Sequence, residues 1–149
     1  MATEDPKDAT HHDAQGRLHL TTMYDTDFYT WAQAQAAALR AKDWAALDVA
    51  HLAAEIEDLG QSIENAIESQ LERLLLHLLK YHFDPAQRPR RGWRLTIRHA
   101  RREIARRLRK NPGLQQHPAR YLAEAYRHAR EDAPDAIGLL PATFPEACP

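Results

Sequence analysis

The amino-acid sequence predicts an all-α protein: an antiparallel bundle of about four helices with a long central helix and an extended C-terminal segment. Alanine and leucine dominate the composition, whereas β-branched residues are few and glycines number only 5, which favours helix over sheet. Apolar residues recur at steps of three and four through several segments, the spacing of an amphipathic helix. With 149 residues, 44% of them hydrophobic, the chain is long enough to bury the core of one domain.

The N-terminal residues show no sustained apolar period. We therefore expect a disordered tail at 1–22 and a single helical domain at 23–149. The first helix is predicted to begin near Asp25 or Thr26, either of which can cap its free N–H groups, and to end near Ala41. The face of this helix that we expect in the core carries Phe28, Trp31, Gln35 and Leu39.

The segment 48–83 is predicted to be the central helix, around which the rest is organised. Its apolar rhythm keeps phase through Gly60, so we expect one continuous helix; a break there into two helices is the alternative. The predicted apolar positions are Val49, Leu52, Ile56, Leu59, Ile63, Ile67, Leu71, Leu74 and Leu78. The run LLLHLL at 74–79 is apolar most of the way round and must be covered on several sides.

Prolines and glycines divide the remaining chain. They indicate a turn at 84–92, a third helix at 93–110 and a stop at Asn-Pro-Gly 111–113. Pro118 suits the first turn of a fourth helix, which we expect to end at Pro134. The last residues are predicted to lie extended across the bundle.

Several features indicate the compartment. The single cysteine, Cys148, excludes an intramolecular disulfide and fits a reducing cytoplasm. The N-terminus lacks the apolar region of a secretory signal, and no apolar run approaches the roughly 20 residues that span a bilayer. We therefore expect a cytoplasmic protein with no membrane association.

Five segments in order resemble the DUF29 family, a group of small, mainly bacterial helical proteins without an established activity. They are DFYTW, LDVAHLAAEIEDLG, LLLHLLKY, WRLTIRHARREI followed by NPGL, and the closing FPEACP. The resemblance covers about 24–149 and implies an all-α fold. It implies no cofactor and no catalytic residue. Tyr81 is a small departure, since it stands where another aromatic residue, often Trp, is usual in the family.

Charge is strongly segregated along the chain. From Asp43 to Glu72 there are eight acidic residues and no Lys or Arg, whereas from Arg88 to Lys110 there are eleven Lys or Arg and one acid. In one interpretation the basic helix packs antiparallel beside the acidic one, and ion pairs fix their register. That interhelix cluster would comprise Glu55, Asp58, Glu64, Arg94 and Arg101.

In the alternative interpretation the outer arginines bind nucleic-acid phosphates. At 100° per residue four of them fall on one line, opposite the Trp93 stripe: Arg91, Arg98, Arg102 and Arg109. Against this, the sequence has no helix-turn-helix or zinc-finger spacing, and no aromatic residue is interleaved among these arginines. The formal net charge of -1 also excludes binding by bulk charge.

His51, Glu55 and His77 are the weak candidates for a metal site. His51 and Glu55 are four residues apart on one helical face, but the sequence lacks HExxH and the repeated Glu-x-x-His of di-iron bundles. His77 lies among leucines, where a core histidine with its N–H satisfied by a carbonyl or carboxylate is more common. We expect neither a metal nor a cofactor.

No motif for a nucleophile or a phosphate-binding loop occurs, so we lean against an enzyme. We expect a non-catalytic helical protein that acts through protein–protein contacts, including a homodimer formed where 74–79 is left uncovered. The alternative is a nucleic-acid-binding accessory protein that uses the helix at 88–110. A metal-dependent enzyme is a distant third possibility.

Overall fold

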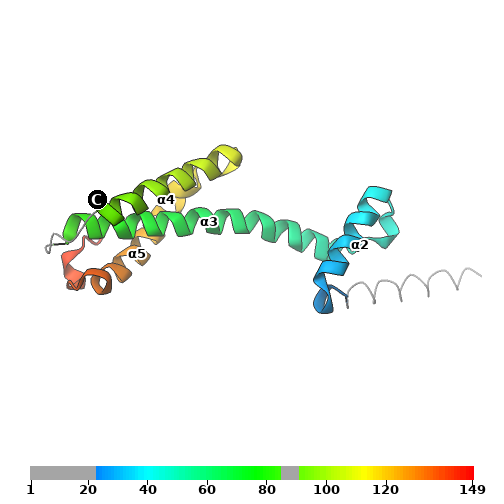
Figure 1. The fold of residues 1–149 in the computed structure, drawn as a ribbon, viewed down its shortest axis with the longest axis horizontal. Helices are drawn as coiled ribbons and strands as arrows, with labels where there is room; N and C mark the ends of the chain where they lie inside the picture. Colours follow the sequence, from blue (N-terminus) through cyan, green and yellow to red (C-terminus); the bar gives the residue numbers. More distant parts are fainter. Residues whose placement is uncertain (1–22, 85–90) are drawn as a thin grey trace, which may run out of the picture. The chain divides into compact units, whose positions relative to one another are not determined.

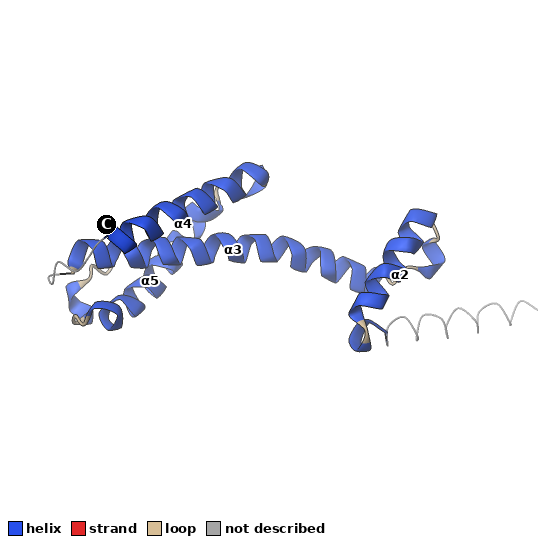
Figure 2. Ribbon diagram, in the orientation of Figure 1, coloured by secondary structure: helices blue, strands red, loops and turns tan. Residues whose placement is uncertain are grey.

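The computed structural model describes residues 23–84 and 91–149, and within these ranges the protein is all-α, as predicted (Figures 1 and 2). The long helices are α2 (Phe28–Ala41), α3 (Val49–Phe83), α4 (Arg91–Lys110) and α5 (His117–Ile137). The short 3-10 helices are η1 (Trp44–Ala46), η2 (Pro112–Leu114) and η3 (Pro141–Thr143). The chain divides into two compact units, Met1–Leu59 and Gly60–Pro149, and each is described separately below.

The central helix α3 is continuous through Gly60, which confirms the main prediction and excludes the break into two helices. A Cβ atom added at Gly60 would meet nothing within 4 Å, so neither a turn nor a close contact requires glycine there. The apolar rhythm therefore outweighs the cost of about 1 kcal/mol that glycine carries inside a helix.

In the first unit, the N-cap of α2 lies one residue after the last cap that we predicted. Residues 23–26 are already helical, and the N-cap is Asp27, whose carboxylate accepts a hydrogen bond from the Thr30 amide at 3.1 Å. The prediction of Asp25 or Thr26 was therefore wrong, because both belong to the preceding helical turn. Trp31 is 2% exposed and buried as predicted, whereas the prediction was wrong for Phe28 and Leu39, which are 48% and 45% exposed.

Gln35 explains why a polar residue shares the buried face of α2. Its Oε1 accepts a hydrogen bond from the Asp48 amide at 2.7 Å, and its Nε2 donates to the Ala46 carbonyl at 3.4 Å. Asp43 caps η1: its carboxylate accepts a hydrogen bond from the Ala46 amide at 3.4 Å. The buried amide thus satisfies backbone groups where η1 meets α3.

The second unit packs the later part of α3 with α4 and α5 (Figure 1). The Lys80 ammonium lies 5.1 Å from the centre of the Trp93 ring, so α4 begins where α3 ends and returns antiparallel to it. Helix α5 then runs in the direction of α3, since His117 contacts Glu68 near its start and Phe144, beyond its end, contacts Phe83.

The core of the second unit lies between α3 and α5. Alanines one turn apart on α5 are 0 to 1% exposed, and their small side chains let the α5 backbone approach α3 closely: Ala125, Ala129 and Ala133. On α3 the buried leucines are Leu71, Leu75 and Leu79. Leu75 and Leu79 within the run 74–79 are therefore covered by the chain itself.

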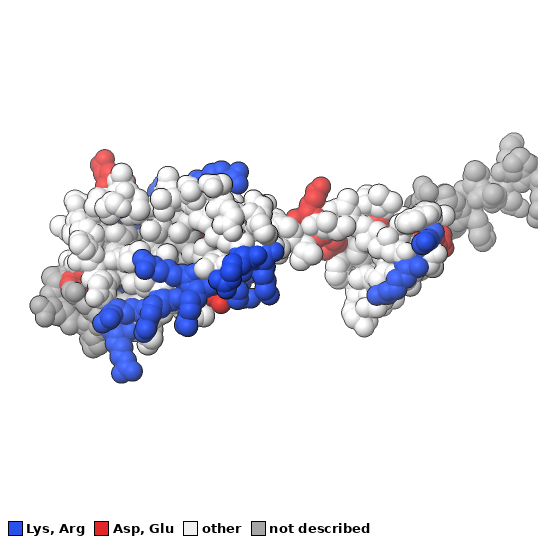
Figure 3. All heavy atoms as spheres, turned by 90° about the horizontal axis from the view of Figure 1, so that it is seen from above, with Lys and Arg blue, Asp and Glu red and all other residues white. Residues whose placement is uncertain are grey.

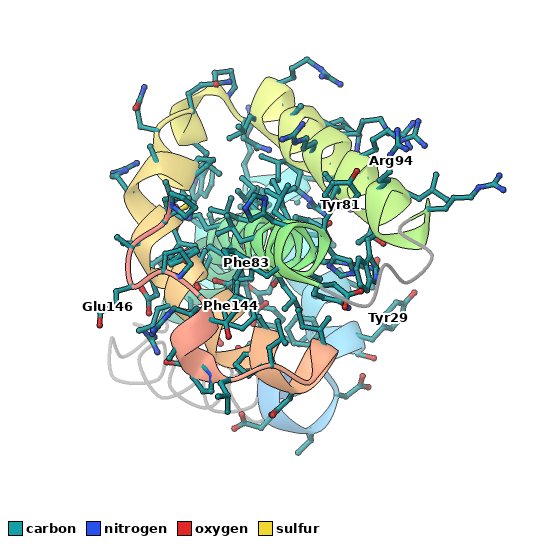
Figure 4. All side chains as sticks on the ribbon, turned by 90° about the vertical axis from the view of Figure 1, so that its left-hand side faces the viewer. Tyr29, Tyr81, Phe83, Arg94, Phe144 and Glu146 are labelled. Atoms are coloured by element: carbon teal, nitrogen blue, oxygen red, sulfur yellow. The ribbon has the colours of Figure 1, made fainter. Side chains whose placement is uncertain are left out.

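The C-terminal segment covers the end of α3. The Phe144 side chain, 2% exposed, lies with its ring centre 5.3 Å from that of Phe83 (Figure 4). The Tyr126 hydroxyl donates to the Pro145 carbonyl at 2.8 Å, and Arg130 Nε donates to the Phe144 carbonyl at 3.2 Å. The segment includes one 3-10 turn, η3.

The predicted end of α5 at Pro134 was wrong. Pro134 lies inside the helix, which continues to Ile137 and ends at Gly138 with a left-handed φ of 73°. The Gly138 amide donates to the Pro134 carbonyl at 2.7 Å, which completes the last turn. Burial of Ala133, Pro134 and Ile137 against the core outweighs the backbone hydrogen bond that proline cannot make.

Candidate nucleic-acid interface

Helix α4 divides cleanly into an apolar side and a cationic side. Ile97 and Ala100 are buried, and Trp93 and Ile104 pack against the core. The opposite flank carries exposed arginines, which gather on one side of the second unit in Figure 3. We define the arginine face as Arg91, Arg94, Arg98, Arg101, Arg102 and Arg109.

Little acid compensates the charge of this helix. Glu103, the single acid of α4, is held by Arg106 with Nη2 and Oε2 2.6 Å apart. The hydrogen bond from Arg106 lowers the pKa of Glu103 and raises the pKa of Arg106. Within 23–84 and 91–149, this ion pair is the only one that involves α4. The arginine face is therefore a local positive surface on a chain whose formal net charge is -1.

A hollow lies between the arginine face and α3. One part of it, about 300 Å³, is lined by Leu78, Tyr81, Arg94, Ile97, Arg98 and Arg101. An adjoining part, about 560 Å³, is lined by Tyr81, Arg91, Arg94 and Arg98. The two parts share Tyr81 and two arginines, so we treat them as one site, the Tyr81 hollow. Figure 4 shows Tyr81 on the side of α3 that faces α4, with Arg94 close by.

A second hollow of about 510 Å³ lies further along α4. It is lined by His99, Arg102, Glu103, Ala105, Arg106 and Arg109. Its lining contains no phenylalanine, tyrosine or tryptophan, and its one acid is the ion-paired Glu103. Both hollows are therefore lined by arginines, but only the Tyr81 hollow has a tyrosine in its lining.

Tyr81 supplies the aromatic side chain whose absence along α4 argued against nucleic-acid binding in the sequence analysis. No aromatic residue is interleaved among the outer arginines along α4, but the antiparallel packing brings one from the last turns of α3. The signal in the sequence was the short connection after the aromatic end of α3. Such a connection brings the end of one helix beside the start of the next.

Three residues of the predicted interhelix charge cluster belong to the second unit: Glu64, Arg94 and Arg101. Arg94 and Arg101 line the Tyr81 hollow beside Leu78. Glu64 precedes Leu78 by fourteen residues, about 21 Å of helix at 1.5 Å per residue, so the structure does not bring Glu64 to these arginines. Asp58, like Glu55, belongs to the first unit, and pairing with the arginines stays a prediction for both.

Two further acids of α3 contact α5 rather than α4. Glu68 Oε1 lies 2.9 Å from His117 Nε2. Glu72 Oε1 accepts a hydrogen bond from the Tyr121 hydroxyl at 2.6 Å and lies 2.7 Å from His128 Nδ1. These two acids therefore contribute to the packing of α5 on α3. Glu68 and Glu72 are four residues apart, and so are their partners His117 and Tyr121. This matched spacing could have predicted from the sequence that α3 and α5 pack together.

The Glu72 carboxylate is the centre of a polar network. Burial acts to raise the pKa of Glu72, but the hydrogen bonds from Tyr121 and His128 outweigh it and hold the pKa below its usual value. The same carboxylate raises the pKa of the Tyr121 hydroxyl. This network fixes the register of α5 on α3, and its contacts within the chain give it a structural role.

The weak metal candidates are held by other contacts. His51 Nδ1 lies 2.7 Å from Asp48 Oδ2, and the His51 ring stacks on Tyr24 with centres 4.0 Å apart. The Tyr24 hydroxyl donates to Glu55 at 2.5 Å. His77 Nδ1 lies 2.8 Å from the Arg73 carbonyl, the satisfied arrangement that we predicted, and burial lowers its pKa. Among the described residues, no three His, Cys, Asp or Glu side chains form a metal-binding group.

Cys148 is exposed and lies at an apolar pocket of about 420 Å³. The pocket is lined mainly by the end of α3 and by the C-terminal segment, with Tyr126 from α5. The thiol Sγ lies 3.9 Å from the Pro149 carbonyl, and His82 lines the same pocket. The pocket therefore has the character of an apolar surface feature.

The family model of the domain of unknown function DUF29 matches residues 23–149. Comparisons with curated proteins and with solved structures gave no match. Across the described ranges, every helix is too short or too polar to cross a membrane. The chain belongs to the DUF29 family.

Proposed function

We propose that this protein is a non-catalytic accessory protein that binds nucleic acid through the arginine face of α4. The observation that carries the proposal is the exposed line of Arg91, Arg98, Arg102 and Arg109, whose guanidinium groups make no ion pair within the described residues. From Arg91 to Arg109 the line extends about 27 Å at 1.5 Å per residue. A series of phosphates along one strand suits this length better than a single small anion does.

Arginine is the residue type expected at such a surface. Its planar guanidinium binds phosphate oxygens through two parallel hydrogen bonds and stays charged at every physiological pH. Two acids of α3 in the second unit, Glu68 and Glu72, contact α5 and so do not neutralise α4. The single cysteine, Cys148, makes a reducing cytoplasm the compartment that we infer.

Fluorescence anisotropy with a labelled 12-nucleotide strand tests the proposal. Replacing Arg91, Arg98, Arg102 and Arg109 by Gln is expected to weaken binding at 50 mM salt by at least about tenfold. The matched control replaces four exposed cations outside α4 by Gln, and should bind nearly as tightly as the wild type: Arg40, Lys42, Arg73 and Arg120. Equal losses in both variants would show that only total charge matters and would overturn the assignment to α4.

A second candidate function is contact with another protein, above all a second copy of this chain. On α3 of the first unit, Val49, Ile56 and Leu59 are 65%, 69% and 65% exposed. They fall within an arc of about 80° on the helix, whereas Glu57 and Asp58 point at least about 120° away from its middle. An apolar stripe with no charge on it suits two-fold pairing with its own copy.

Light scattering at micromolar concentration tests this second candidate. We expect the mass of a dimer for the wild type and the mass of a monomer after Ile56→Glu, which places a carboxylate in the stripe. Glu57→Gln, on the other side of the helix, is the control and should stay dimeric. A monomeric wild type would exclude the homodimer.

A further inference from the structure

We propose that the Tyr81 hollow is a stacking site for an unpaired base of single-stranded nucleic acid, with Arg94 and Arg98 on the flanking phosphates. This inference rests on the proposed function, because it requires that a strand lies along the arginine face. It adds the kind of nucleic acid and the place where a base is held.

The lining of the hollow matches a flat ring that carries phosphate. Leu78 and Ile97 supply apolar walls and Tyr81 supplies an aromatic one, while Arg94, Arg98 and Arg101 supply positive charge. A base needs an apolar or aromatic face to stack on, and its phosphates need cations within reach of the same ring. The volumes of about 300 Å³ and 560 Å³ lie in the range of small-molecule sites.

The same features favour a single strand over a duplex. In a duplex both faces of each base are covered by neighbouring bases, so a tyrosine can stack only on a base that has left the helix. The side chain of Tyr81 belongs to α3, and the hollow lies between α3 and the exposed flank of α4. An unpaired base of a flexible strand can turn into this position while its backbone stays on the arginines.

The second hollow gives an internal contrast. It has the cations Arg102, Arg106 and Arg109 but none of the larger aromatic side chains, and His99 is its one ring. We therefore expect it to hold the backbone of the strand. A strand along α4 would then be held by stacking at the Tyr81 end and by charge at both ends.

The experiment compares three probes of equal length: a single strand, the same strand with abasic sites, and a duplex. Wild-type protein is expected to bind the single strand about 5- to 150-fold more tightly than the abasic strand, the range expected for one stacked base. Tyr81→Leu should remove this preference, whereas Tyr81→Phe, which keeps the ring, should retain it to within about twofold. Circular dichroism confirms that each variant keeps its helix content.

A probe that needs no variant gives an independent readout. A 2-aminopurine base in the strand should lose fluorescence on binding wild-type protein, because stacking on Tyr81 quenches it. Anisotropy that rises without this loss of fluorescence would overturn the stacking site. An unchanged affinity of Tyr81→Leu for the single strand would do the same. So would a free mononucleotide that competes as strongly as the strand. In these cases the four-arginine variant still tests the proposed function. Absence of any binding at low salt would remove the proposed function itself.

Discussion

The two ends of α3 share one helix and one apolar rhythm, yet their apolar side chains have opposite environments. Near its start, Val49, Ile56 and Leu59 are 65%, 69% and 65% exposed. Further along, Ile67 and Leu79 are 0% and 4% exposed. The comparison teaches that a periodic sequence predicts the helix and its apolar face, but not which neighbour covers that face.

The neighbours differ in chemistry. The later part of α3 meets the alanine stripe of α5, an apolar surface that accepts leucines closely. The early part is contacted on another side, where His51 and Glu55 meet Tyr24. Packing in the first unit therefore uses aromatic and polar side chains and leaves the apolar stripe exposed.

The largest expected effect comes from Trp31, since the first unit depends on this one buried ring. Trp31 is 2% exposed and packs edge-on to Tyr24, with ring centres 4.9 Å apart. Trp31→Ala is expected to cost about 3–5 kcal/mol. Hydrogen exchange should show the loss of protection confined to the first unit. Loss of protection in α5 as well would mean that the two units unfold together.

The next prediction sets one leucine from each end of α3 against the other. Leu79→Ala is expected to lower the free energy of unfolding by about 2–5 kcal/mol, because it leaves a cavity in the core. In the monomer, Leu59→Ala should change it by less than about 0.5 kcal/mol, as surface substitutions do, whereas a dimer formed through the stripe would lose more. Urea denaturation of both variants measures the difference. A large loss for Leu59→Ala would show that the stripe is covered in solution, as the second-copy proposal requires.

A smaller effect concerns the acids of α3. The folded protein holds the pKa of Glu72 below its unfolded value, so Glu72 contributes stability above the unfolded pKa, and this is lost as pH falls through the folded pKa. Glu72→Gln should therefore cost about 1–2 kcal/mol at pH 7 and progressively less in acid. Urea midpoints from pH 7 to pH 3 measure this. The exposed Glu57→Gln is the control, and an equal loss there would contradict a special role for Glu72.

The smallest prediction concerns Gly60, where the second unit begins. Gly60→Ala is expected to stabilise the protein by about 1 kcal/mol, because alanine favours helix and its Cβ would meet nothing within 4 Å. Thermal denaturation measures the shift. A loss of stability would instead indicate that another chain packs closely on Gly60.

The elements that local rules decide were predictable from the sequence. The helix through Gly60 followed from the apolar phase, and the start of α5 followed from Pro118. Pro134 was mispredicted because the local rule that proline ends a helix lost to burial of its neighbours. The cap at Asp27 was missed because helical structure already precedes it.

The candidate site was only half predictable. Helical geometry alone placed Arg91, Arg98, Arg102 and Arg109 on one exposed line, as the structure has them. The contribution of Tyr81 depends on which part of α3 lies beside α4, and that is a property of tertiary packing. A sequence read along one helix cannot show an aromatic residue that another helix supplies.

The salt dependence of binding to a single strand tests the central claim most directly. Four phosphate contacts, one for each arginine of the line, predict a slope of about −2.8 in a plot of log affinity against log salt, or about a 50-fold loss between 50 and 200 mM. The four-arginine variant should show a clearly shallower slope, because only the contacts of the remaining cations, such as Arg94 and Arg106, are left. An affinity that does not change with salt, or no binding at 50 mM, would contradict nucleic-acid binding through α4.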